Sequence, residues 1–192
     1  MRLNGLALLL KATGDYAAAE PLYRRALAIA EKAQGPEHPS TGTSLNNLAL
    51  LLQATGDYAA AEPLYRRALA IAEKALGSES EAAMRSHHKL HHKLGAILRK
   101  SGKLTEAEDE LRIAVGLGGK FQKGAPFIEL ADLREQQGRL DEAEELLKRA
   151  LEIRQAALPA GDASITEGVN RLADLYERMG RMEEAAQLRQ KD

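Results

Sequence analysis

Residues 46–77, NNLALLLQATGDYAAAEPLYRRALAIAEKALG, occur a second time in this chain in almost the same form. Residues 4–35 match them at an offset of 42, with 29 identities in 32 positions. The three differences are Gly5/Asn47, Lys11/Gln53 and Gln34/Leu76. Because such similarity does not arise by chance, we interpret the chain as an array of repeated structural units.

A glycine marks the same point in each unit of this repeat. The five are Gly14, Gly56, Gly102, Gly138 and Gly180, at spacings of 42, 46, 36 and 42 residues. We expect these glycines to adopt a left-handed backbone at the end of a helix, a conformation that glycine accepts at little cost. The spacings predict four full units and one partial unit.

Each unit shows two apolar stripes with helical spacing, one on either side of the glycine. Around residues 46–77 the first stripe is Leu45, Leu48, Leu51 and Leu52, and the second is Leu64, Tyr65, Ala68, Leu69 and Ala72. Pro21 and Pro63 are expected in the first turn of the second helix. Small residues recur at three places per unit, where two antiparallel helices can approach closely. They are Ala7, Ala19 and Ala26; Ala49, Ala61 and Ala68; Gly95, Ala107 and Ala114; and Ala131, Ala143 and Ala150.

The pattern Leu48-Ala49, Leu52, Gly56, Tyr58, Ala61, Tyr65 and Ala68 resembles the tetratricopeptide repeat, whose usual period is 34 residues. The longer period of 42 and the motif Tyr65-Arg66-Arg67-Ala68-Leu69 are similar to the kinesin-light-chain type in the N-terminal half. The resemblance implies an all-α fold, a right-handed superhelical solenoid of antiparallel helix pairs with about 4.5 repeats and about ten helices. We expect one solenoid over residues 1–192, with repeats at approximately 3–38, 39–79, 80–118, 119–158 and 159–192.

Two segments depart from the pattern. The tetrapeptide His-His-Lys-Leu at 87–90 is repeated at once at 91–94, which accounts for the spacing of 46. Four added residues nearly preserve the apolar face of a helix, so we expect one longer helix there. Residues 116–120, Gly-Leu-Gly-Gly-Lys, are predicted to form a flexible connection that acts as a hinge.

Composition excludes several classes of protein. The chain of 192 residues has no cysteine, which removes disulfide scaffolds, cysteine-ligated zinc and thiol catalysis. A net charge of −1 and 4% aromatic residues argue against nucleic-acid binding. No aliphatic run approaches the roughly 20 residues that span a bilayer, so no membrane partner is expected. The N-terminal Leu-Ala-Leu-Leu-Leu recurs at 48–52, which favours a repeat helix over a secretion signal and predicts a cytoplasmic protein.

No residues point to catalysis or to a cofactor. The pairs His87/His91 and His88/His92 have i, i+4 spacing and offer an adventitious metal site, but no third ligand is evident. We otherwise expect these histidines on a solvated helix face. Residues 116–120 lack the spacing and the preceding strand of a phosphate-binding loop. The Glu and Asp residues at 106–110 and 141–145 are expected on helix exteriors. The protein is therefore predicted not to be an enzyme.

In a solenoid of this kind the first helix of each unit lines a concave groove. In kinesin-light-chain-like repeats asparagines of this groove hold the backbone of an extended peptide, a role that the resemblance assigns to Asn46 and Asn47. Alternatively these amides cap or solvate the helix. The expected groove residues are Asn4, Asn46, Asn47, Leu50, Gln53, His92, Lys93, Arg99, Glu129, Asp132, Asn170 and Asp174.

Positive and negative charges are unevenly distributed along the predicted groove. Residues 1–100 hold 13 Lys+Arg and 9 Asp+Glu, whereas residues 101–192 hold 14 and 19. This polarity favours a ligand whose acidic part meets the N-terminal half and whose basic part meets the other half. The carboxylate clamp of co-chaperone tetratricopeptide domains is incomplete, because Asn4 and Leu8 stand where Lys and Asn are expected.

The leading hypothesis is a non-enzymatic adaptor that binds an extended peptide or a partner protein in this groove. The alternative is a structural module that self-associates through its N-terminal repeat. That repeat nearly duplicates an interior one and has no polar capping helix, so apolar residues should be exposed on it. A fragment of a longer protein or an engineered repeat would explain the same observation.

Overall fold

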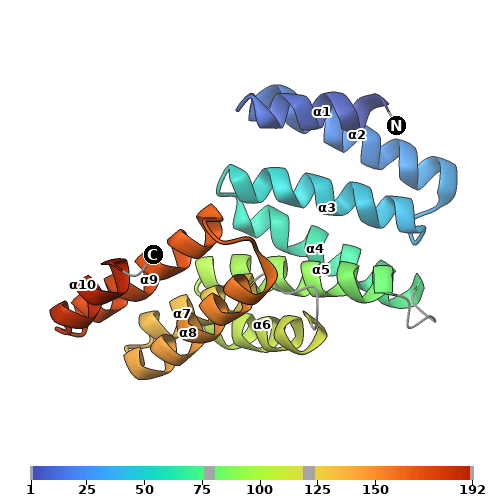
Figure 1. The fold of residues 1–192 in the computed structure, drawn as a ribbon. Helices are drawn as coiled ribbons and strands as arrows, with labels where there is room; N and C mark the ends of the chain where they lie inside the picture. The colour runs from blue at the N-terminus through green and yellow to red at the C-terminus, as the bar shows by residue number, and fades with distance from the viewer. Residues whose placement is uncertain (1, 76–80, 119–123, 191–192) are drawn as a thin grey trace. The chain divides into compact units, whose positions relative to one another are not determined.

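The structure is a computed structural model that describes residues 2–75, 81–118 and 124–190. Within these residues the chain forms ten α-helices and no strand (Figure 1). They are α1 (Arg2–Ala12), α2 (Tyr16–Gln34), α3 (Pro39–Ala54), α4 (Tyr58–Ala75), α5 (Glu81–Lys100), α6 (Leu104–Gly118), α7 (Ala125–Gln136), α8 (Leu140–Ala157), α9 (Ala163–Arg178) and α10 (Met182–Gln190). The all-α class that the sequence predicts is confirmed.

The helices follow one another as five pairs, which we number repeats 1 to 5. Within each repeat the two helices pack together, and inside the units α2 packs on α3, α4 on α5 and α8 on α9. The chain divides into two compact units, Met1–Leu117 (unit 1) and Gly118–Asp192 (unit 2). That all repeats form one solenoid stays a prediction.

The turn inside each repeat is built on the predicted glycine. Gly14, Gly56, Gly102, Gly138 and Gly180 have φ angles of 84°, 82°, 80°, 74° and 79°. This left-handed conformation disfavours a side chain, which explains why glycine recurs there and confirms the prediction. In repeats 1 and 2 an aspartate then caps the second helix, where Asp15 Oδ1 accepts from the Ala18 amide at 3.0 Å and Asp57 Oδ1 from the Ala60 amide at 3.0 Å.

The small residues lie where the helices of a pair cross. Every predicted alanine of the four triplets is buried, with an exposure of at most 7%. At Gly95 an added Cβ would lie 2.6 Å from Leu111 Cγ, so only glycine permits the approach of α5 to α6. The prediction of close crossings is confirmed.

Three local predictions have different outcomes. Pro21 and Pro63 are the sixth residues of α2 and α4, one turn deeper than predicted, so each removes an intrahelical N–H donor. Helix α5 continues through the doubled tetrapeptide and is 20 residues long, as expected. The predicted flexible connection is wrong for residues 116–118, which are the last residues of α6, and residues 119 and 120 lie outside the described residues.

The cores are aliphatic. In unit 2 the buried cluster contains Leu147, Val169, Leu172, Leu175 and Tyr176. In unit 1 Leu45, Leu48, Leu51, Ile97 and Leu111 are at most 1% exposed. Among the described helices, none combines the length and the apolar character needed to cross a bilayer.

Candidate functional site

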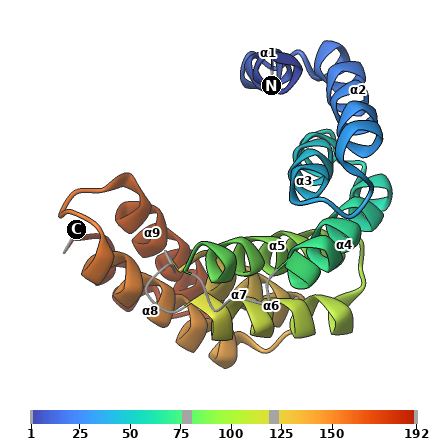
Figure 2. The same ribbon diagram turned by 90° about the vertical axis from the view of Figure 1, so that its right-hand side faces the viewer.

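The first helices of repeats 1 to 3 follow the inner side of unit 1. Figure 2 shows α1, α3 and α5 on this side and α2, α4 and α6 behind them. We call the surface carried by α1, α3 and α5 the inner face. The predicted groove residues of unit 1 are all half-buried, so each keeps some contact with solvent: Asn4, Asn46, Asn47, Leu50, Gln53, His92, Lys93 and Arg99.

Two of these residues hold a buried polar atom that has no hydrogen-bond partner among the residues that the structure describes. They are Asn4, through Oδ1, and His92, through Nε2. Asn4, Asn46 and His92 occupy the same position of the repeat, at offsets of 42 and 46. An unpaired buried polar atom costs free energy, and a ligand group that pairs with it recovers that cost.

Gln53 is engaged inside its own repeat. The Tyr65 hydroxyl donates to Gln53 Oε1 at 2.7 Å, and Tyr65 is fully buried. Burial raises the pKa of Tyr65 well above its usual range, so the hydroxyl stays protonated and remains a donor. This amide oxygen therefore helps to orient α4 against α3, a role that sequence reasoning missed.

Three lysines of the inner face lie close together. Burial, together with the nearby positive charges of Lys11 and Lys89, lowers the pKa of Lys93 to about 8. Burial also lowers the pKa of Lys11. Lys11 comes from α1 whereas Lys89 and Lys93 come from α5, so helices of two different repeats build the cluster. Within the described residues none of the three forms an ion pair.

His92 stands beside this lysine cluster. Burial lowers the pKa of His92 to about 4, and His88 and Lys93 contribute to the shift. The imidazole is therefore neutral at pH 7. A neutral imidazole has one donor and one acceptor nitrogen, so His92 adds hydrogen-bonding capacity to the inner face without adding charge.

The other histidines do not form the solvated face that the sequence predicts. His88 and His91 are each 7% exposed and pack on α6. His88 Nδ1 bonds the Ala114 carbonyl oxygen at 2.8 Å, and His91 Nδ1 bonds Glu110 Oε2 at 2.6 Å. Since both acceptors are oxygens, each imidazole donates through Nδ1. The added turn thus places two histidines in the contact between α5 and α6.

A metal site at these histidines has no support in the described part of the chain. No group of three His, Asp or Glu side chains there has an arrangement that could hold a metal ion. The rings of His87 and His91 lie edge to face with centroids 6.3 Å apart, and those of His88 and His92 are 6.5 Å apart. Two of the four imidazoles already form hydrogen bonds, His91 with Glu110 and His88 with the Ala114 carbonyl oxygen.

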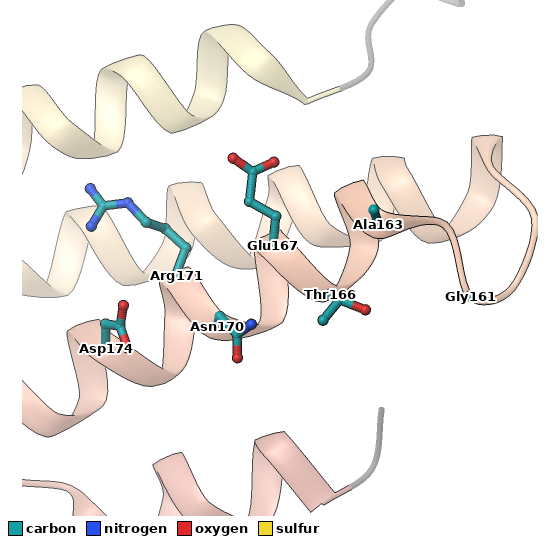
Figure 3. Close-up of a pocket in the computed structure, with 7 residues that line it drawn as sticks. All are labelled: Gly161, Ala163, Thr166, Glu167, Asn170, Arg171 and Asp174. Carbon is teal, nitrogen blue, oxygen red and sulfur yellow. The ribbon is translucent and has the colours of Figure 1, made fainter.

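Unit 2 carries a pocket on α9, the first helix of repeat 5 (Figure 3). Its volume is about 670 Å³. The predicted groove residues Asn170 and Asp174 both line it, and Figure 3 shows the side chains of Asn170 and Glu167 leaving α9 in different directions. The described residues that line the pocket are Gly161, Ala163, Thr166, Glu167, Asn170, Arg171 and Asp174.

The carboxylates of unit 2 are paired with arginines. Asp132 forms an ion pair with Arg171, whose pKa is raised although burial alone would lower it. Asp174 pairs with Arg189 at 2.6 Å. Glu129 is half-buried and also has an interaction partner. The predicted acidic end of the groove is therefore largely neutralised, which removes the main argument for a basic segment in the ligand.

A buried network in unit 2 was also missed. Glu144 is 8% exposed and accepts hydrogen bonds from the Tyr176 hydroxyl at 3.1 Å and from Arg181 Nη1 at 2.5 Å. The prediction that the acidic residues at 141–145 lie on a helix exterior is wrong for Glu144. Tyr176 and Arg181 belong to repeat 5, so no pattern inside one helix identifies these two partners. A third partner, Lys148, pairs with Glu144 at 2.8 Å across one turn of α8.

Each helix pair is joined by a glycine with a left-handed backbone, and successive pairs stack on one another inside each unit. This arrangement defines a helical repeat scaffold. The chain belongs to the tetratricopeptide repeat family, whose model matches residues 1–74, 86–156 and 122–191. Proteins of this family generally mediate protein–protein interactions and are typically not enzymes. Comparison with curated protein sequences gave no match.

Solved structures with this fold include kinesin-light-chain-like proteins. One is a candidate kinesin light chain from Podospora anserina with nearly identical TPR-like repeats, at 28% identity over 97% of this chain and 90% of that chain, with a TM-score of 0.76. A point variant of that protein gives 28% identity, coverage of 99% and 91%, and a TM-score of 0.79. The predicted resemblance to kinesin-light-chain repeats is confirmed.

More distant structures share the fold alone. BtubC (BKLC) from P. vanneervenii has a TM-score of 0.80 at 23% identity, over 98% of this chain and 76% of that chain. YrrB, a TPR protein with an unusual peptide-binding site, has a TM-score of 0.58 at 19% identity, over 98% and 81%.

Proposed function

We propose that this protein is a non-enzymatic adaptor that binds an extended acidic peptide across the inner face of unit 1. The observation that carries the proposal is the cluster of Lys11, Lys89 and Lys93, which has no carboxylate partner among the described residues. Bringing positive charges together and away from water costs free energy, and an acidic ligand offsets that cost.

The neighbouring residues suit an extended backbone. Asn46 and Asn47 are half-buried on α3, between the helices that carry the lysines. An amide side chain can donate to a peptide carbonyl and accept from a peptide N–H, so it can hold a strand-like ligand whatever its side chains are. The unpaired Asn4 Oδ1 and His92 Nε2 offer two further polar contacts. The lysines would then select for acidic side chains.

The test is a displayed-peptide selection on the whole protein, run beside the variants Lys93→Gln and Lys93→Arg. We expect acidic sequences to be enriched by the parent and by Lys93→Arg, and to bind Lys93→Gln about tenfold more weakly, since only the last substitution removes the charge. Arg112→Gln is the matched control, because Arg112 lies on the second helix α6, is exposed and loses one positive charge in the same way.

A second variant separates the backbone contacts from the charges. Asn46→Ala/Asn47→Ala should weaken the binding of the selected peptide. It should weaken the binding of a neutral counterpart, in which Asn and Gln replace Asp and Glu, by the same factor. Enrichment of the same peptides by the parent and by Lys93→Gln would overturn the proposal. So would the recovery of neutral or basic sequences alone.

A further inference from the structure

The first helix of unit 1 leaves two leucines exposed that its repeated copy buries. Leu6 and Leu9 on α1 are 49% and 61% exposed, whereas their counterparts Leu48 and Leu51 on α3 are 1% and 0% exposed. The sequences around both pairs are nearly identical, so the difference comes from their neighbours. Helix α2 packs on α3, but no described helix packs on the same side of α1 (Figure 1).

The basic residues beside these leucines show the same difference. On α4, Arg67 Nη1 donates to Glu31 Oε1 at 2.6 Å, and Lys74 Nζ lies 2.5 Å from Glu37 Oε1. Both glutamates belong to repeat 1, so these pairs join repeat 2 to the repeat before it. The counterparts on α2 are Arg25 and Lys32, which form no ion pair within the described residues.

These four residues, Leu6, Leu9, Arg25 and Lys32, make up what we call the N-terminal face. It reproduces one half of the contact between repeats 1 and 2. The other half of that contact is α2 with the loop that follows it, which supplies an apolar helix side together with Glu31 and Glu37. A helix that binds the N-terminal face should therefore have an apolar side with carboxylates beside it.

Charge argues against a second copy of the chain as the occupant. A symmetric contact would bring the unpaired Arg25 and Lys32 of one molecule toward those of the other, and juxtaposed like charges disfavour association. An acidic complement removes this cost and forms ion pairs as well. The favoured occupant thus carries negative charge beside its apolar side, as α2 and the loop after it do.

We propose that the N-terminal face is a docking surface for an amphipathic helix of a partner protein that carries glutamates placed as Glu31 and Glu37 are. The helix packs apolar side chains on Leu6 and Leu9, and its glutamates pair with Arg25 and Lys32. This surface is separate from the inner face, which takes an extended ligand.

The probe is a synthetic peptide with the sequence of residues 16–39, YAAAEPLYRRALAIAEKAQGPEHP, stapled on the side opposite Glu31 and shown to be helical by circular dichroism. Binding to the full chain is measured by fluorescence anisotropy. We expect Leu9→Gln to weaken binding at least tenfold and Leu8→Gln to leave it unchanged. Leu8 is equally exposed at 61%, but it points about 100° away around the helix.

A charge exchange tests the ion pair directly. Arg25→Glu in the protein, or Glu31→Arg in the peptide, should each weaken binding about fivefold, and the two changes together should restore it. Failure of the helical peptide to bind, or equal binding to Leu8→Gln and Leu9→Gln, would overturn the proposal. A dimer of the unmodified chain by analytical ultracentrifugation that Leu9→Gln dissociates would also overturn it, because a second copy would then occupy the face. Lys93→Gln should not change this binding, so the result is independent of the proposed function of the inner face.

Discussion

The Tyr65 hydroxyl donates a 2.7 Å hydrogen bond to Gln53 Oε1, which ties the second helix of repeat 2 to the end of the first. Repeat 1 has a tyrosine at the same place, Tyr23, but Lys11 stands where Gln53 is expected. A lysine ammonium has only donors and cannot accept from the phenol. Repeat 1 therefore lacks a hydrogen bond that repeat 2 has, and it gains a positive charge on the inner face.

Lys11→Gln should stabilise unit 1 and weaken the binding of an acidic peptide. The new amide oxygen can accept from Tyr23, and one such hydrogen bond raises the free energy of unfolding by about 1 kcal/mol. Urea unfolding of the full chain measures the change. In a Tyr23→Phe background the gain should vanish, and a lower urea midpoint for Lys11→Gln alone would contradict the assignment.

The affinity for an acidic peptide should fall as the pH rises through about 8, the pKa to which burial and neighbouring lysines lower Lys93. Below that pH the ammonium is charged and attracts the ligand, and above it the charge is lost. We expect about a tenfold loss between pH 7 and pH 9.5, measured by calorimetry. The Lys93→Arg variant should show no such fall, because arginine stays protonated throughout.

The free protein should respond in the opposite sense over the same range. The folded-state pKa of Lys93 lies below its ordinary value of 10.5, so between about 8 and 10.5 the unfolded chain binds more protons. The contribution of Lys93 to stability therefore rises with pH in this window. Lys93→Met should remove that rise, and an identical pH dependence of urea unfolding in parent and variant would count against the low pKa.

The repetition explains why so much of the fold can be predicted from the sequence. The glycine of each turn and the small residues of each crossing serve a local backbone requirement, so they recur wherever the unit recurs, as Gly14 and Gly56 do. Such constraints act within one repeat, and periodicity reveals them. The depth of Pro21 in its helix is different, because it depends on where the first turn starts and shifts easily by a few residues.

The site was harder to predict because it depends on contacts between repeats. Arg171 and Asp132 are 39 residues apart, and only the stacking of repeat 5 on repeat 4 brings them together. The burial of His88 and His91 did leave a signal, since together with Gly95 they follow helical spacing on one side. Because the tetrapeptide is doubled, however, histidines occur at several positions around the helix, and the sequence alone does not show which of them face α6.

Protonation of His92 should destabilise unit 1 in mild acid. Burial lowers its pKa to about 4, below the ordinary value of 6.5, so between these values the unfolded chain binds more protons and stability falls as the pH falls. We expect His92→Gln to recover roughly 2 kcal/mol of the stability lost between pH 7 and pH 4. Urea unfolding at both pH values measures the difference, and equal losses in parent and variant would contradict it.

Glu144→Gln should destabilise unit 2 by about 2 kcal/mol at pH 7, because the buried carboxylate accepts from Tyr176, Lys148 and Arg181. Burial alone raises the pKa of Glu144, but these hydrogen bonds outweigh it and lower the pKa below 4.5. The contribution is therefore present above pH 4.5 and is lost as the pH falls through the folded-state pKa.

The neighbouring Glu145, with a side chain 77% exposed, supplies the control for this prediction. Glu145→Gln should change the free energy of unfolding by less than about 0.5 kcal/mol. Hydrogen exchange in α8 and α9 locates the effect in unit 2. If the two variants unfold at the same urea concentration, the buried network does not stabilise the contact between repeats 4 and 5.

Gly95→Ala and Gly116→Ala should change stability in opposite directions, although both place the same methyl group in a helix of repeat 3. A Cβ at Gly95 would lie 2.6 Å from Leu111 Cγ and 3.2 Å from the Ala107 oxygen, so α5 and α6 must separate, at a cost of about 1–3 kcal/mol. A Cβ at Gly116 meets nothing within 4 Å, and the better helix propensity of alanine should add about 0.5–1 kcal/mol. Chemical denaturation of both variants makes the comparison.

The double variant Gly95→Ala/Leu111→Ala should lose less stability than the sum of the losses of the two single variants, because Leu111→Ala removes the side chain with which the new methyl group clashes. Additive costs would show that Leu111 is not what makes glycine necessary at this crossing.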